Sequence, residues 1–229
     1  FGPDWQEDPR WQIHFCGIDL AAFERPADPG LRRALRLPEG RSIIGHVGRF
    51  EAQKNHAFLV EIAAELARTG APVHFLLVGD GGLRATFDGE IARRGLGSMF
   101  TVVPRSADVP RLLALMDGFV FPSLYEGLGL AAVEAQAAGL PTLLSERVPE
   151  EATVEETLVR RLDLDAGAAA WAEAVAGLLA QGRREDAAFR RALAATPFNV
   201  AKSADGLINI YLEELNKDKV YALDNKRAA

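Results

Sequence analysis

The sequence is poor in the features that mark secreted and membrane-spanning proteins. Its 229 residues include one cysteine, Cys16, which excludes an internal disulfide and fits a reducing compartment. No apolar run approaches the length of about 20 residues that crosses a bilayer, and no secretory signal opens the chain. Lys and Arg number 26 against 32 Asp and Glu, so the formal net charge is -6, which argues against a nucleic-acid partner held by diffuse charge. We expect a globular protein of the cytoplasm.

Several common catalytic signatures are missing as well. The four histidines show no metal-ligand spacing, and there is no Gly-x-Ser-x-Gly elbow or Ser/His/Asp set. His46 and His74 fall inside predicted strands and are expected to be packed side chains. No Met precedes Phe1 and no strand begins there, so we expect a fragment of a longer chain.

Short apolar runs alternate with segments of helical periodicity along most of the chain. Strands separated by helices of this length build a doubly wound parallel sheet, so the predicted fold is α/β and Rossmann-like, with helices on both faces. An Ala-rich end predicts a helical C-terminal extension at 167–179, 184–195 and 201–215. About six strands are expected, at residues 42–48, 73–78, 99–103, 118–121, 141–144 and 158–161.

Two cations follow the first predicted strand, at the edge of the sheet where the loops after parallel strands gather. Arg49 comes directly after the strand, and Lys54 comes five residues later, before the first helix. A forked guanidinium and a point-charge ammonium together suit a diphosphate, which spreads its negative charge over several oxygens. A pair of solvated surface cations is the alternative.

The loop after the fourth strand and the helix that follows it are the most informative part of the sequence. They carry two carboxylates, Glu126 and Glu134, with seven residues between them. Gly127 and Gly129 let backbone N–H groups approach a phosphate, and a helix starting near Leu128 adds partial positive charge. Helical side chains lean toward the N-terminus, so Glu134 could accept ribose hydroxyls while Glu126 faces the sugar. Alternatively, Glu134 is an ordinary exposed helix residue and Glu126 is a capping or turn residue.

Two further loops reach the same edge. The turn at 79–82 follows the second strand but lacks a full dinucleotide fingerprint. It is predicted to be a tight turn near the ligand, or a purely structural turn. Arg105 and Ser106 follow the third strand, where a nucleobase could rest against the backbone.

These residues together resemble the carboxyl-terminal half of retaining glycosyltransferase family 4, whose members have the GT-B fold. The resemblance is close over residues 14–145 and looser beyond them. The sequence at 124–128 and 134–141 is similar to that of bacterial capsule and exopolysaccharide enzymes. The chain departs from the family pattern at Pro104 and Gly82, where Gly and Pro respectively are common. The matching stretches are Cys16 to Leu20 with Phe23, Gly48 to Phe50 with Lys54, and residues 78–84, 105–110 and 122–141.

The resemblance implies a nucleotide-activated sugar, of the UDP, GDP or ADP type, as the donor. It implies that Arg49 and Lys54 hold the diphosphate and stabilise it as leaving group, with Glu126 at the donor sugar, and these three are the predicted catalytic residues. Family members generally work without a bound metal or other cofactor, since cations replace a metal at the departing diphosphate. The predicted donor-binding residues are Gly48, Gly81, Arg105, Gly127, Leu128, Gly129, Leu130 and, at the ribose, Glu134.

The resemblance also implies a second half. In the GT-B fold an amino-terminal Rossmann-like domain carries the acceptor site, and it is expected to precede Phe1. The chain then divides into an interdomain linker region (1–25), a nucleotide-sugar-binding domain (26–195), a C-terminal crossing helix (196–215) and a flexible or vector-derived tail (216–229).

The implied enzyme transfers a hexose or other sugar, with retention, to a hydroxyl of a glycan or lipid-linked acceptor. The expected process is capsular, exopolysaccharide or other glycan synthesis. The intact enzyme is expected in the cytoplasm, peripheral at the inner face of the cell membrane. This chain alone is expected to bind nucleotide without transferring sugar.

Two other functions fit parts of the pattern. A sugar-nucleotide 2-epimerase of the same fold would also place Arg and Glu around a diphosphate, but it needs an acid/base pair that is not evident here. The second is a non-catalytic α/β nucleotide-binding or phospho-receiver module. A receiver would need acidic residues after the first and third strands, where this chain has Arg49 and Arg105.

Overall fold

The computed structural model describes residues 13–104, 106 and 108–227. These residues form two compact units, Ala21–Arg190 and, separately, residues 13–20 with 191–227. The sheet and the predicted binding loops belong to the larger unit. None of the helices within the described ranges combines the length and the apolar character of a bilayer-crossing segment.

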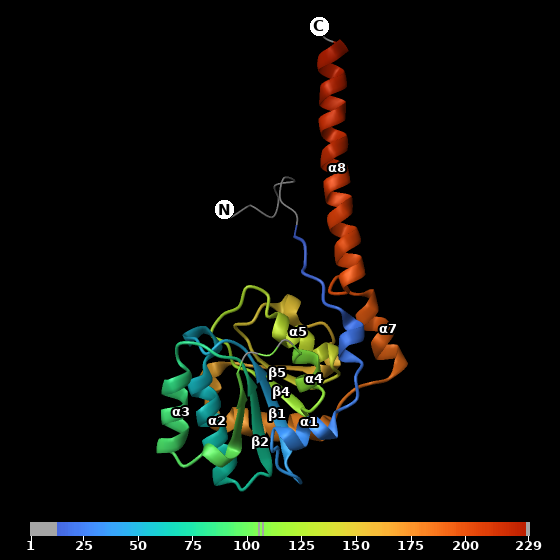
Figure 1. Ribbon diagram of the computed structural model, residues 1–229. Coiled ribbons are helices and arrows are strands. Elements are labelled where there is room, and N and C mark those ends of the chain that lie inside the picture. Colours follow the sequence, from blue (N-terminus) through green and yellow to red (C-terminus); the bar gives the residue numbers. More distant parts are fainter. Residues whose placement is uncertain (1–12, 105, 107, 228–229) are drawn as a thin grey trace. The chain divides into compact units, whose positions relative to one another are not determined.

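The larger unit is built on a six-stranded parallel sheet (Figure 1). Its strand order is β3-β2-β1-β4-β5-β6, so the order reverses between β1 and β4. The predicted Rossmann-like α/β fold is confirmed. The strands are β1 (Ser42–Val47), β2 (Val73–Val78), β3 (Phe100–Val103), β4 (Gly118–Phe121), β5 (Thr142–Ser145) and β6 (Val159–Leu162).

Helices join the strands, as Figure 1 shows. The α-helices are α1 (Pro29–Ala34), α2 (His56–Arg68), α3 (Arg84–Arg93), α4 (Val109–Leu113), α5 (Leu130–Ala137), α6 (Gly167–Gln181), α7 (Ala187–Ala195) and α8 (Val200–Arg227). The 3-10 turns are η2 (Leu20–Phe23), η3 (Ala52–Lys54), η4 (Gly97–Met99), η5 (Glu150–Ala152), η6 (Glu156–Leu158) and η7 (Leu164–Ala166).

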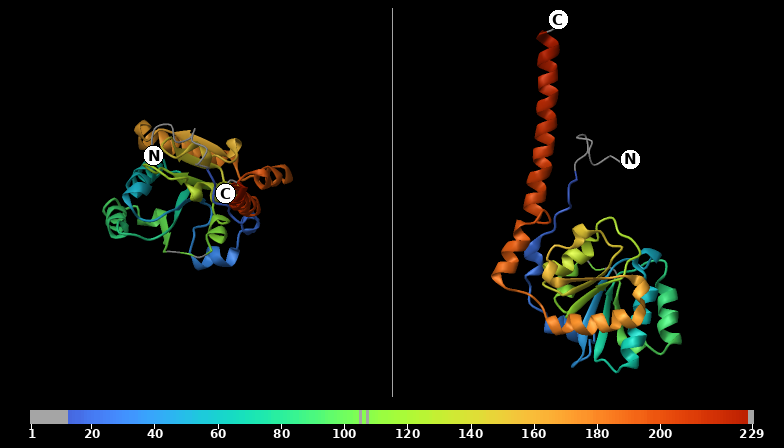
Figure 2. Two further views of the ribbon diagram at one scale, coloured as in Figure 1. Left: turned by 90° about the horizontal axis from the view of Figure 1, so that it is seen from above. Right: turned by 180° about the vertical axis from the view of Figure 1, so that it is seen from behind.

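The main hydrophobic core lies between the sheet and the helices α2, α3 and α6. In the rear view of Figure 2, α6 crosses in front of the strands, and it packs against α2, β4 and β5. Trp171 of α6 is fully buried there, with its ring centroid 5.6 Å from that of Phe58. On the opposite face of the sheet, a Cβ at Gly45 would lie 1.9 Å from the Met116 sulfur. Glycine in β1 therefore lets the chain after α4 pack directly on the strand.

Two helix boundaries differ from the sequence-based expectation. α5 begins at Leu130 rather than near Leu128, because Gly129 is in the left-handed conformation (φ 87°, ψ 43°) and ends the loop there. α8 runs to Arg227 rather than ending at Leu215. Neither Gly nor Pro occurs after Gly206 to stop it.

In the smaller unit, the segment before η2 lies along the start of α8. Ile18 donates its N–H to the Phe198 carbonyl at 2.8 Å, and its own carbonyl accepts the Val200 N–H at 3.0 Å. The Ser203 hydroxyl accepts the Gly17 N–H at 3.2 Å. A Cβ at Gly17 would lie 2.5 Å from Val200 Cα, so glycine is required for this close approach. Further along α8, the exposed apolar residues are Leu207, Ile208, Tyr211, Leu212 and Leu215.

Candidate functional site

The loop after β1 and the turn after β2 pack backbone to backbone. The Phe50 N–H donates to the Asp80 carbonyl at 3.0 Å. A Cβ at Gly79 would lie 2.0 Å from the Gly48 oxygen, and a Cβ at Gly81 would lie 2.7 Å from the Phe50 oxygen. This close approach accounts for glycine at both positions without a ligand.

Lys54 crosses Gly48 and reaches the loop after β4. A Cβ at Gly48 would lie 3.0 Å from the Lys54 Cγ and Cδ atoms, so glycine leaves room for this path. The Lys54 Nζ lies 2.6 Å from Glu126 Oε1 and 4.6 Å from the centroid of the Phe121 ring. The two charged side chains are 16% and 6% exposed. The pair fixes both side chains, because either charge would be costly to leave alone in this shielded position.

Gln53 and Asn55, on either side of Lys54, hold the same loop. Gln53 Nε2 donates to Glu126 Oε2 at 3.2 Å and to the Tyr125 carbonyl at 3.0 Å. Asn55 Nδ2 donates to the Pro122 carbonyl at 3.1 Å. Neither residue was singled out from the sequence. The signal that could have found them is a polar side chain on each side of Lys54.

Arg49 does not join the ion pair of Lys54. Its guanidinium is 75% exposed and lies 3.0 Å from the Glu51 carboxylate. An exposed pair of this kind contributes little to stability, so the guanidinium can leave Glu51 for another anion at low cost.

The loop from Glu126 to α5 combines an open glycine with a constrained one. A Cβ at Gly127 would meet no atom within 4 Å. Gly129 is buried and left-handed, and its carbonyl accepts the Ala132 N–H at 2.8 Å. The N–H groups of Leu130 and Ala131, ahead of that bond, have no acceptor within the helix and carry its partial positive charge.

Glu134 lies further along α5 and is partly buried. Burial raises the pKa of its carboxyl above the ordinary value of 4.5, because the charged form loses solvent. Within the described residues, no donor or cation offsets this cost. Glu134 therefore presents an acceptor that no described residue satisfies.

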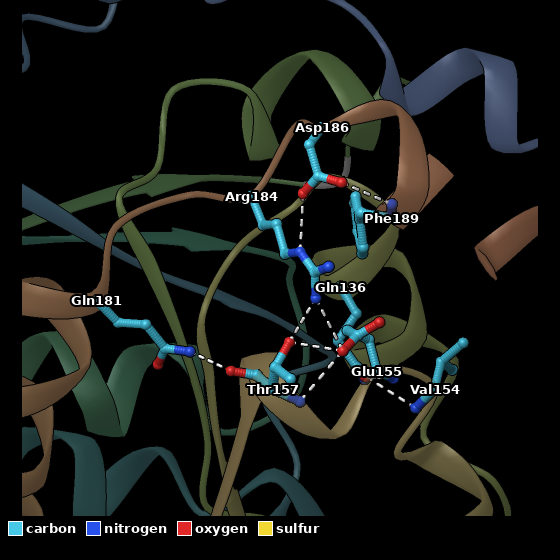
Figure 3. Close-up of polar contacts among 8 residues, drawn as sticks. All are labelled: Gln136, Val154, Glu155, Thr157, Gln181, Arg184, Asp186 and Phe189. Carbon is cyan, nitrogen blue, oxygen red and sulfur yellow. Dashed lines mark hydrogen bonds and ion pairs between the residues drawn. The ribbon is translucent and has the colours of Figure 1, made fainter. Parts of the chain in front are cut away.

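Gln136, also on α5, is fully buried, and both ends of its amide are hydrogen-bonded; Figure 3 shows it beside Val154 and Glu155. Its Nε2 donates to the carbonyls of Ala132 and Ala152 at 2.9 and 2.7 Å. Its Oε1 accepts the N–H groups of Val154 and Glu155 at 2.8 and 3.1 Å. One side chain thus ties the loop after β5 to the helix α5.

Arg184 anchors the same loop from its other side (Figure 3). Its Nη1 lies 3.1 Å from the Glu155 carboxylate and donates to the Thr157 hydroxyl at 2.7 Å. The anchored loop bounds the turn before α5, since a Cβ at Gly129 would lie 3.2 Å from Val148 Cγ1. The loop after β5 is therefore a fixed wall beside the candidate site.

Two buried histidines lie beside the loop after β1. His46 Nδ1 is 2.9 Å from the Val120 carbonyl, and the His56 ring stacks on Phe50 with centroids 3.9 Å apart. Burial holds the pKa of His46 well below its ordinary value and lowers that of His56 to about 4. Both rings are therefore uncharged at neutral pH. The expectation of packed histidines in strands is met by His46 and His74, which are 0% and 4% exposed.

The described ranges contain no group of three or more His, Cys, Asp or Glu side chains placed to hold a metal ion. A cavity of about 470 Å³ opens between α2 and α3, with Val60, Leu83 and Phe87 among its walls. It borders the predicted site, since Asn55 and Leu124 also line it, but Lys54, Glu126 and the start of α5 do not.

The structure brings Gly48, Lys54 and Glu126 together where β1 and β4 are neighbours. Arg49, Gly81 and the segment 127–130 border the same edge of the sheet, and Glu134 follows on α5. Arg105, the predicted nucleobase contact, lies outside the described residues.

The chain resembles known proteins in sequence. The sequence pattern described as glycosyl transferases group 1 matches residues 28–194. EpsF of Bacillus subtilis (strain 168), assigned by name to the glycosyltransferases, is 35% identical over 221 residues. The match covers 95% of this chain and 57% of EpsF, so the chain spans little more than half of that relative.

Solved structures share the fold of this chain. A glycosyltransferase from Rickettsia africae ESF-5 matches with a TM-score of 0.76 and 19% identity, over 89% of this chain and 57% of that one. HepE of Anabaena, solved in complex with UDP and glucose, matches with a TM-score of 0.69 and 19% identity, over 87% of this chain and 56% of that one. The fold is the C-terminal type of GT-B, and the chain belongs to the glycosyl transferases of group 1.

Proposed function

We propose that this chain is the donor-binding half of an enzyme that transfers a sugar from a nucleoside diphosphate to a hydroxyl acceptor. The observation that carries the proposal is the Lys54–Glu126 pair at the β1–β4 junction. Open α/β sheets bind ligands at the point where the strand order reverses. A complex of HepE, which shares the fold, with UDP and glucose supports the choice of ligand by analogy.

The proposed binding mode follows from the charges at this edge. Lys54 supplies a fixed ammonium, and Arg49 supplies a guanidinium free to turn toward a diphosphate. N–H groups at the start of α5 add donors for phosphate oxygens. Glu134, whose carboxylate lacks a donor in the described part of the chain, accepts the ribose hydroxyls. Glu126 accepts hydroxyls of the donor sugar.

The proposed chemistry is electrostatic. The bond between the anomeric carbon and the diphosphate oxygen breaks while the two cations neutralise the departing diphosphate. The acceptor oxygen bonds to the anomeric carbon on the same face, and its proton passes to the diphosphate, so the configuration is retained. This scheme uses no metal and no further cofactor.

The acceptor site belongs, in this proposal, to a second Rossmann-like half that this chain does not include. The exposed apolar residues of α8 between Leu207 and Leu215 suit contact with such a domain. The acceptor is a glycan or a lipid-linked hydroxyl in exopolysaccharide or related synthesis, in the cytoplasm at the inner face of the membrane. This chain alone binds nucleotide without transferring sugar.

Calorimetric titration of the chain with UDP, GDP and ADP tests the proposal. We expect one of the three to bind, and we expect Arg49→Ala to weaken that binding about tenfold through loss of a charge-assisted contact. Arg41→Ala, at the opposite end of β1, is the matched control and should leave affinity unchanged. Absence of binding by all three nucleotides at millimolar concentration would falsify the proposal.

A further inference from the structure

Gln53 forms hydrogen bonds with three consecutive residues of the loop after β4. Its backbone carbonyl accepts the Leu124 N–H at 2.8 Å. Its side-chain Nε2 donates to the Tyr125 carbonyl at 3.0 Å and to Glu126 Oε2 at 3.2 Å. The main chain and the side chain of one residue therefore set both the course of this loop and the position of one carboxylate oxygen.

Gln53 and Lys54 take different oxygens of the same carboxylate. The Lys54 Nζ is 2.6 Å from Glu126 Oε1, and the Gln53 amide is on Oε2. An ammonium is a point charge with rotatable donors, so it fixes where a carboxylate lies but leaves its plane free. The terminal torsion of a glutamate is soft. A second donor on the other oxygen is what fixes the plane.

Both N–H groups of the Gln53 side chain are used within the protein. A glutamine amide has two N–H groups, and here they serve the Tyr125 carbonyl and Glu126. Each Glu126 oxygen keeps a further lone pair for another donor. The donors of Gln53 therefore act on a ligand through Glu126, because both N–H groups are already used.

We infer that Gln53 is a positioning residue that orients the Glu126 carboxylate so that its remaining lone pairs read the hydroxyls of the donor sugar. The inference rests on the proposed donor-binding function and adds to it a residue that controls sugar recognition separately from nucleotide binding. The diphosphate contacts of Arg49 and Lys54 do not require Gln53.

The test compares each nucleoside diphosphate with its sugar conjugate by calorimetry, using the whole chain. The probes are UDP with UDP-glucose, GDP with GDP-mannose, and ADP with ADP-glucose, taking whichever pair the wild type binds. Gln53→Met keeps the length of the side chain and removes both donors. We expect nucleoside diphosphate affinity to stay within about twofold and sugar-nucleotide affinity to fall about tenfold, the effect of losing one hydrogen bond to a charged group.

Gln53→Glu sharpens the measurement, because it places a second carboxylate against Glu126 and should widen the gap between the two affinities. Gln181→Met is the matched control: Gln181, at the end of α6, donates to the Thr157 carbonyl and to neither the loop after β1 nor the loop after β4. It should leave the ratio of the two affinities unchanged. Thermal melting by circular dichroism confirms that each variant is folded.

The outcomes separate this inference from the proposed function. If the wild type binds nucleotide but folded Gln53 variants keep the wild-type ratio of affinities, the positioning role is overturned and the proposed function stands. An equal loss for both ligands has the same meaning, since it reports a general change of the loop. A wild type that binds neither member of any pair overturns the proposed function, and this inference with it.

Discussion

Glu126 and Glu134 lie eight positions apart on one loop and its helix, and their surroundings in the protein differ. Glu126 is 6% exposed and has a cation on one oxygen and an amide on the other. Glu134 is partly buried, and among the described residues nothing donates to it, so burial raises its pKa. Two side chains hold the first carboxylate, and the second has no such partner in the part of the chain that the structure describes. Partners, more than position along the loop, set the two roles.

Breaking the Lys54–Glu126 pair should have the largest effect. Lys54→Met leaves the Glu126 charge in a shielded position without its cation, which costs about 3 kcal/mol of unfolding free energy. It also removes one of the two proposed diphosphate contacts, so nucleotide binding should be lost in calorimetry. Urea unfolding followed by circular dichroism measures the stability.

Lys202→Met, at an exposed lysine of α8, is the control for that change and should stay within about 0.5 kcal/mol of the wild type. A loss at Lys54 no larger than this would mean that solvent reaches Glu126 and that the protein does not hold it as the geometry indicates.

The second prediction compares the stability of two variants at polar positions of α5, Gln136→Leu and Glu134→Leu. Gln136→Leu leaves the partly buried N–H groups of Val154 and Glu155 without their acceptor, and should cost about 2 kcal/mol in urea unfolding. Glu134→Leu removes a carboxylate that has no partner within the described chain, and should leave stability unchanged or raised. Equal losses in the two variants would contradict the contrast between satisfied and unsatisfied groups on α5.

For nucleotide binding, the comparison is between Glu134 and Glu126, and the loss should be larger at Glu134. Glu134→Ala should weaken nucleotide affinity about tenfold, since it removes the proposed charged acceptor of the ribose hydroxyls. Glu126→Ala should weaken it less, while destabilising the fold more, because Lys54 loses its partner. Calorimetry and urea unfolding of both variants give the comparison. A larger binding loss at Glu126 would mean that the roles of the two glutamates are exchanged.

The sheet could be predicted from the sequence because its signal is local. β2 is a run of residues buried on both faces, and β4 is another, so each strand shows as a continuous apolar stretch. The start of α5 was misplaced for an equally local reason. The conformation of Gly129 depends on the loop it closes and has no counterpart in periodicity.

The site was predictable in its residue types and not in its contacts. Lys54 and Glu126 are 72 positions apart, and their meeting depends on β4 lying beside β1. It depends also on Gly48, which leaves the path of the lysine free. A glutamine before a lysine is ordinary on a protein surface. The contacts of Gln53 with the loop after β4 could therefore be recognised only from the structure.

The smallest expected effect is on the pH dependence of stability, and it tests the unsatisfied state of Glu134 directly. Burial raises the folded-state pKa above 4.5, so the folded protein holds this proton more tightly than the unfolded chain does. The stability that this group contributes is present below its unfolded pKa and is lost as the pH rises through the folded pKa. Glu134→Gln removes the titration, so the variant should match the wild type near pH 4 and become the more stable of the two toward pH 7, as measured by urea unfolding across this range. If the variant instead becomes less stable than the wild type as the pH rises, the ionised carboxylate has a partner in the folded protein. Glu134 would then resemble Glu126 rather than differ from it.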